Sequence, residues 1–241
     1  DDVESRGLGD VYKRQILTFI EDNLKRRILL PYLTAHFWWM GHDDEPMCNW
    51  TVWCTQNVLL TTFLMPWSVE MSSRLSSPVR TFCGNAPLFL PENTSDTVVT
   101  LQAILHKAAE SCDYFLKDYG NDGCCEEGAQ YYRHAGLCLY GAMTVLNTVT
   151  DGHFDTLFRW DKVKNIASYI LNVHVNDKYY FNFADCSPIA GRAGVREYLF
   201  GKATGQADLC LFAAKDFQAG QGQLVTDEVN GGNPVSYTHL R

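Results

Sequence analysis

Residues 95–117, which read SDTVVTLQAILHKAAESCDYFLK, decide the fold class of this chain. Apolar residues recur there at the three- and four-residue spacing of one helix face, and Ser95 or Asp96 can cap the first turn. The stripe consists of Val98, Leu101, Ile104, Leu105, Ala108, Cys112, Phe115 and Leu116. The pattern predicts a long amphipathic helix.

The same helical spacing continues on both sides of this stretch. It predicts further helices over residues 16–33, 51–65, 126–149, 162–173 and 205–217. Alternation of the strand type is scarce and is clearest over residues 178–183. The chain is therefore predicted to be all-α, and serial helical hairpins suit a toroid or a solenoid.

Composition narrows the class of protein further. The chain has 241 residues, of which 46% are hydrophobic, and its formal net charge is −8. These values exclude a disordered tail and a basic nucleic-acid-binding protein. The longest apolar run ends at Pro66, well short of a membrane span. Neither nucleic acid nor a membrane is an expected partner, and the oligomeric state stays open.

The nine cysteines show no regular spacing and no CxxC pair. Zinc sites need closely spaced ligand pairs, and disulfide scaffolds are usually shorter and richer in cysteine. The sequence therefore predicts free thiols, with no metal and no cofactor. Free thiols favour the cytoplasm over the periplasm, although both compartments stay open.

Both ends of the chain resemble translated sequencing-adapter sequence. The resemblance lies in GLGDVYKRQ at residues 7–15 and in VSYTHLR at residues 235–241. We therefore expect residues 1–15 and 235–241 to be artefacts and residues 16–234 to be an interior fragment of a longer protein. The two ends carry four acidic and four basic residues, so the charge of −8 belongs to the remainder.

Two segments have a composition suited to chemistry. The first, HFWWMGHDDEPMCNWTVWCTQN at residues 36–57, contains four tryptophans, two histidines and three amide side chains. Clustered tryptophan beside polar groups is typical of a sugar-binding cleft, where the ring stacks on a pyranose and the amides bind hydroxyls. An aromatic core at a helix entry is the alternative.

The second segment is DGCCEEGAQYYRHAG at residues 122–136. Asp-Gly predicts a turn, and the predicted helix would place Glu127, Tyr131 and His134 on one face, with Tyr132 and Arg133 on its flanks. Nearby cations favour the phenolate form of a tyrosine. A polar helix start with ordinary surface tyrosines is the alternative.

Together these segments resemble the heparinase II/III-like family of polysaccharide lyases, whose patterns read Asn-Trp and Asp-Gly-x-x-x-Glu-Gly-x-x-Tyr. FADCSP at residues 183–188 is also similar to a later family segment, and the resemblance covers residues 26–217. It implies a bacterial protein with an incomplete (α/α) toroid, whose C-terminal β-sandwich is absent from this chain. A histidine that the sandwich often supplies would then be absent too, leaving this fragment without part of its site.

The resemblance implies β-elimination on glycans that contain uronic acid, so an acidic polysaccharide or oligosaccharide is the expected partner. Neutralising the carboxylate makes the neighbouring C5 proton removable, and one tyrosine can act as base and then as acid. The implied catalytic residues are Asn49 for the carboxylate, Tyr131 or else Tyr132 for proton transfer, and Glu127 and His134 in support. The implied substrate-binding residues are Trp50, Trp53, Asn57, Arg133 and His42.

Two other functions fit the same residues. A glycoside hydrolase would pair Glu127 with Asp43 or Asp185 as its two carboxylates. A glycan-binding toroid without activity would need no acid or base. Because a net charge of −8 repels an acidic substrate, the lyase requires a local basic patch. The candidates for this patch are Arg26, Arg74, Arg80, Arg133, Arg192 and Arg196.

Overall fold

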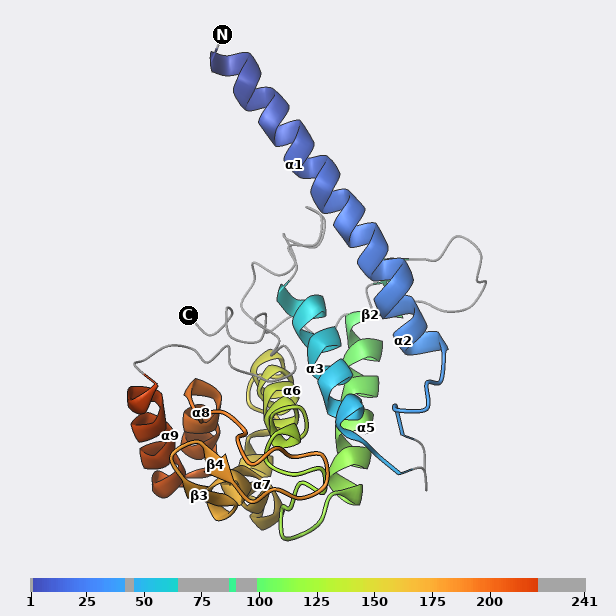
Figure 1. The fold of residues 1–241 in the computed structure, drawn as a ribbon. Helices are drawn as coiled ribbons and strands as arrows, with labels where there is room; N and C mark the ends of the chain where they lie inside the picture. Colours follow the sequence, from blue (N-terminus) through green and yellow to red (C-terminus); the bar gives the residue numbers. More distant parts are fainter. Residues whose placement is uncertain (1, 42–45, 65–86, 90–98, 221–241) are drawn as a thin grey trace.

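The computed structural model describes residues 2–41, 46–64, 87–89 and 99–220, and it is mostly helical, as predicted (Figure 1). The first helical segment consists of α1 (Asp2–Leu24), the π-helix η1 (Lys25–Leu29) and α2 (Leu30–Thr34). It confirms the helix expected over residues 16–33, but it begins earlier and includes a π-helical turn. Figure 1 shows α1 projecting away from the remaining helices.

Three helices form the centre of the molecule. They are α3 (Asn49–Leu64), α5 (Leu101–Asp118) and α6 (Gly136–Val149), and α3 packs against both others. Leu59, Phe115 and Met143 are buried in their shared core. The predicted helices are thus confirmed over residues 51–64 and 101–117, whereas Val99 and Thr100, predicted as helix, form strand β2. Ser95 and Asp96, the expected caps, lie outside the described residues.

A short strand pair precedes α5. Strand β1 (Pro87–Phe89) pairs antiparallel with β2 (Val99–Thr100), placing Pro87 opposite Thr100. The chain then passes directly from β2 into α5.

The prediction of one helix over residues 126–149 is wrong in its first third. Residues 126–130 form turns, η2 (Tyr131–Arg133) is a single 3₁₀ turn, and α6 begins only at Gly136. The physical reason is the backbone at Gly128, whose φ of 90° is incompatible with a right-handed helix. Glu127, Tyr131 and His134 therefore do not share one α-helical face.

The C-terminal part of the described chain is a second helical group. It contains the 3₁₀ helix η3 (Asp155–Arg159), α7 (Asp161–Asn172), α8 (Val195–Thr204) and α9 (Ala207–Ala219), and α8 packs against α7 and α9. Helices α7 and α9 confirm the predictions for residues 162–173 and 205–217. Helix α8 was not predicted. It connects to α9 through Gly205, whose φ is 73°.

The strand expected over residues 178–183 is shorter in the structure. Strand β4 (Tyr179–Tyr180) pairs antiparallel with β3 (His174–Asn176) in a small hairpin after α7. The chain leaves the hairpin through an irregular segment that leads to α8, so this segment belongs to the loops rather than to a sheet.

Two further findings concern the part of the chain that the structure describes. All eight cysteines there are free thiols, as predicted, whereas Cys83 lies outside it. No described helix combines the length and apolar character that a bilayer crossing requires.

Candidate functional site

A side-chain hydrogen bond joins the two segments that the sequence singled out. Asn49 Nδ2 donates to Glu127 Oε2 over 3.1 Å, although 78 positions separate the residues. Asn49 opens α3 and is only 4% exposed. The start of α3 is held in place because Met47 N donates to Asp118 Oδ2 (2.9 Å) and Thr51 Oγ1 donates to the Trp39 carbonyl (2.6 Å).

Glu127 lies in a tightly constrained loop. Gly123 and Gly128 both have a positive φ, of 75° and 90°, which glycine adopts without strain. Asp122 Oδ1 accepts the Cys124 N–H (3.0 Å), and Tyr169 Oη donates to the Cys125 carbonyl (3.2 Å). These bonds explain how a non-helical segment can hold a carboxylate in one position.

A third segment packs against this loop. A Cβ on Gly128 would lie 2.4 Å from Cys186 Cβ, and Ser187 N donates to Gln130 Oε1 over 3.3 Å. The neighbouring Asp185 is close enough for its charge to act on Glu127. Burial, then the charge of Asp185, raises the pKa of Glu127, while a hydrogen bond from the Asn49 backbone opposes the rise. The structure thus brings FADCSP beside the other two segments.

Asn49 and Glu127 line a hollow of about 420 Å³, within the usual size of ligand pockets. Its wall in the described part of the chain consists of Pro46, Met47, Cys48, Asn49, Phe115, Asp118, Tyr119, Gly120, Cys124, Cys125, Glu126, Glu127 and Ala135. No sequence pattern singled out Asp118, the last residue of α5, or Tyr119, which follows it. Asp118 and Tyr119 line the hollow only because α5 ends beside the loop that carries Glu127.

Tyr131 lies outside the wall of this hollow and is linked to it through aromatic rings. Its ring centroid lies 5.8 Å from that of His134, whose ring in turn lies 4.4 Å from Trp53. Trp53 follows Asn49 by four positions, so the two side chains lie on the same side of α3. All three rings are half-buried, as suits groups beside a site.

Tyr132 is a structural residue rather than a second candidate for the base. It is fully buried, and its hydroxyl donates to the Ala167 carbonyl over 3.0 Å. Burial raises the pKa of Tyr132 well above its usual range, which opposes formation of a phenolate. The structure therefore favours Tyr131 over Tyr132.

Arg133 is also structural, which corrects its assignment to substrate binding. Its side chain is buried, donates to the carbonyls of Ala190 and Arg192, and lies 3.8 Å from Glu197 Oε1. A guanidinium engaged in this way cannot also receive a substrate carboxylate without losing the contacts that hold the 190–197 segment.

The tryptophans have different environments. The Trp53 ring packs against His134, as described, whereas Trp50 is 47% exposed and lies 5.6 Å from the Trp38 ring. Asn57 is half-buried on α3, two turns after Asn49, and is not part of the wall of the hollow. His42 and Asp43 lie outside the described residues.

No match to the chain was found among models of protein families or among curated proteins. The resemblance to heparinase II/III-like lyases therefore rests on the motifs themselves. What the structure adds is that the three motif segments lie together.

Charge around the hollow differs from the expected basic patch. Three acidic residues, Asp118, Glu126 and Glu127, line it, and its described wall contains no arginine or lysine. Arg192 pairs with Asp216 and Asp177, while Arg196 donates to Gln56 Oε1 and to the Leu137 carbonyl. Arg192 and Arg196, like Arg133, therefore stabilise contacts within the fold. Arg74 and Arg80 lie outside the described residues, and Arg26 is exposed on η1.

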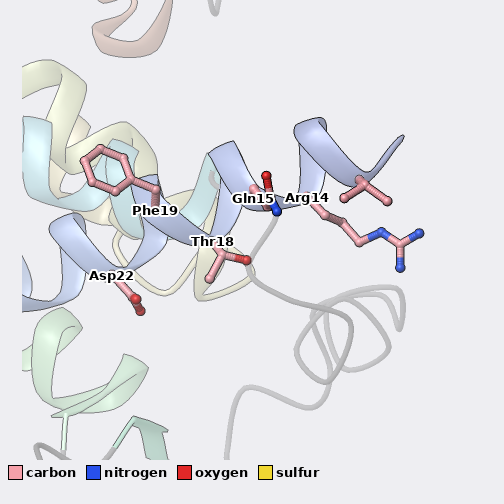
Figure 2. Close-up of a pocket in the computed structure, with 6 residues that line it drawn as sticks. Arg14, Gln15, Thr18, Phe19 and Asp22 are labelled. Atoms are coloured by element: carbon pink, nitrogen blue, oxygen red, sulfur yellow. The ribbon is translucent and has the colours of Figure 1, made fainter. Parts of the chain in front are cut away.

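A second hollow, of about 540 Å³, lies along α1 (Figure 2). The described residues that line it are Val11, Arg14, Gln15, Thr18, Phe19 and Asp22, all from one helix. A site needs groups that converge from several elements, and half of these residues belong to the adapter-like end. We assign this hollow no function. Within the described chain, no three His, Cys, Asp or Glu side chains are placed to hold a metal ion.

Proposed function

We propose that this chain is part of a polysaccharide lyase that cleaves glycans containing uronic acid by β-elimination. The observation that carries the proposal is the 3.1 Å hydrogen bond between Asn49 and Glu127 at the hollow, because it joins the two motifs of the resemblance. The packing of α3 against α5 and α6, and of α8 against α9, suits the partial (α/α) toroid that such a lyase requires.

The substrate carboxylate would be bound by Asn49 and Glu127. One N–H of the Asn49 amide is used by Glu127, and the other is available to donate to the substrate. Burial and the charge of Asp185 raise the pKa of Glu127, which makes its carboxyl group easier to protonate than a solvent-exposed one. In the protonated form it would donate a second hydrogen bond to the same carboxylate. Two donors neutralise the carboxylate without a cation, which fits the acidic wall of the hollow.

Tyr131 would perform the proton transfers. As a phenolate it takes the C5 proton of the uronate, the C4–O bond breaks, and a C4=C5 double bond forms. The phenol then returns the proton to the departing glycosidic oxygen. His134 and Trp53 position the tyrosine ring through the contacts described above. No water is consumed, and the product carries an unsaturated sugar at its new end.

One observation favours a glycoside hydrolase as the second candidate. Asp185 is near enough for its charge to raise the pKa of Glu127, and an acid with a raised pKa beside an ionised carboxylate is the arrangement that glycosidic hydrolysis uses. Hydrolysis would give a reducing end with no double bond.

Ultraviolet absorbance distinguishes these functions. Incubation with a panel of alginate, hyaluronan and polyglucuronate should yield an ultraviolet-absorbing product, and Tyr131→Phe should lower its rate at least about a hundredfold. Tyr179→Phe, an exposed tyrosine on β4, is the matched control. The hydrolase would be favoured over the lyase if new reducing ends formed without any ultraviolet-absorbing product. In that case Asp185→Asn should abolish their formation, and Tyr131→Phe should leave it unchanged.

A further inference from the structure

Two tryptophan rings stand exposed beside the start of α3. Trp38 is 64% exposed and Trp50 is 47% exposed, and their centroids lie 5.6 Å apart with planes tilted by 40°. Exposed tryptophans carry a large apolar area that water solvates poorly. A pair of them therefore needs an explanation.

The segment that presents Trp38 is firmly anchored. The rings on either side of it, Phe37 and Trp39, stack at 5.6 Å with planes only 2° apart. Met40 is 2% exposed and donates its N–H to the Phe37 carbonyl (2.8 Å), and the Trp39 carbonyl accepts the Thr51 hydroxyl. Trp38 is thus held outward by a fixed backbone, which lowers the entropic cost of binding a ligand.

The pair adjoins the hollow. Trp50 directly follows Asn49, and consecutive helical side chains diverge by about 100°. Asn49 lines the hollow and Trp50 does not, so the Trp50 ring lies next to the hollow without forming part of its described wall. A chain-like ligand with one unit at Asn49 would carry its next units past these rings.

We infer that Trp38 and Trp50 form a stacking subsite for a pyranose unit of the glycan chain, outside the unit that is held by Asn49 and Glu127. The inference rests on the proposed function. The apolar C–H face of a pyranose fits a neutral aromatic surface whatever charge the sugar carries elsewhere. Such a subsite would supply affinity that the acidic hollow does not gain from electrostatic attraction.

Calorimetric titration of the full chain with uronate oligosaccharides tests this inference. The probes are hyaluronan and alginate disaccharides and hexasaccharides. Trp38→Ala and Trp50→Ala should each weaken hexasaccharide binding roughly tenfold and leave disaccharide binding nearly unchanged. Trp50→Phe should restore most of the loss. Trp160→Ala, which removes a tryptophan of similar exposure (51%) before α7, is the matched control.

Asn49→Ala separates the subsite from the proposed function, because it should weaken binding of both oligosaccharide lengths. If the wild-type chain binds hexasaccharides and both tryptophan variants bind them equally well, the subsite is wrong while the proposed function stands. If no uronate oligosaccharide binds, the proposed function fails and the subsite fails with it. A fall in thermal stability typical of a core substitution would show that the rings are covered by protein, which also overturns the subsite.

Discussion

Glu127 shows how a neighbourhood changes a side chain. It is half-buried, accepts a hydrogen bond from Asn49 and lies near two further carboxylates, Asp185 and Glu126. Burial and like charge raise the pKa of Glu127. Ionising this carboxyl group therefore costs more free energy in the folded protein than in the unfolded chain.

Stability should therefore depend on pH through Glu127. The pKa of Glu127 is higher in the folded protein than in the unfolded chain. The contribution of Glu127 to stability is therefore greatest at a pH below its unfolded-state pKa, and it declines as the pH rises through the folded-state pKa. Glu127→Gln does not titrate and keeps an oxygen for Asn49, so its melting temperature should exceed that of wild type at pH 7, by on the order of 1 °C after solvent screening. Thermal unfolding from pH 3 to pH 8 checks this. A difference that does not shrink toward low pH would contradict it.

Tyr131 and Tyr132 are adjacent in sequence but differ in environment. Tyr131 is half-buried against His134, whereas Tyr132 is fully buried. Tyr132→Phe should lower the free energy of unfolding by about 1 kcal/mol, because it removes the hydrogen bond to the Ala167 carbonyl. Urea denaturation measures this loss. If turnover disappears while stability is unchanged, Tyr132 is the base after all.

At the scale of elements, the loop between α5 and α6 decides where the site lies. A continuous helix would have placed Glu127 and Tyr131 one turn apart. The positive φ of Gly128 instead turns the chain, so that Glu127 meets α3 and the residues after it contact the Cys186 segment.

Gly123 tests how tightly this loop is held against α7. A Cβ there would lie 2.2 Å from the Asn165 carbonyl carbon, whereas a Cβ on Gly152, whose φ of 85° is similar, would meet nothing within 4 Å. Gly152→Ala should cost only the backbone strain, about 1 kcal/mol. Gly123→Ala should cost about 3 kcal/mol or more, because α7 must also move. Equal losses in urea denaturation would show that the loop yields freely.

Across the described part of the molecule, buried arginines connect segments that are far apart in the sequence. Arg133 joins η2 to Glu197 on α8, and Arg196 joins α8 to Gln56 on α3. These contacts connect the two helical groups around the site. Because both guanidinium groups are engaged inside the fold, they do not add positive charge to the hollow.

Removing one of these contacts should be costly. Arg133→Ala leaves Glu197, with a side-chain exposure of 5%, buried without its cation, and it should lower the free energy of unfolding by about 3 kcal/mol. Arg159→Ala, which breaks an exposed pair with Asp155, is the matched control and should cost under about 0.5 kcal/mol. Chemical denaturation of both variants is the measurement. Similar losses would contradict a structural role for Arg133.

How well a helix can be predicted from the sequence depends on how regularly apolar residues recur along it. The helices over residues 101–117 and 162–172 are predictable from the sequence because one apolar face repeats through each of them. Helix α8 was missed because Arg196 and Glu197, buried through their partners, interrupt its apolar pattern. For the proposed site, the sequence pattern pointed to Asn49, Glu127 and Tyr131, but it could not separate Tyr131 from Tyr132, because burial depends on packing against α7.

The sequence by itself determined that the chain is mostly helical, that it is acidic, and that its unusual residues lie in three short segments, because periodicity and composition are local properties. Only the tertiary structure decided that these segments meet, that Arg133 and Arg196 are structural, and that Trp38 joins Trp50 at the surface. Those facts depend on contacts between residues far apart in the chain, which spacing along the sequence does not specify.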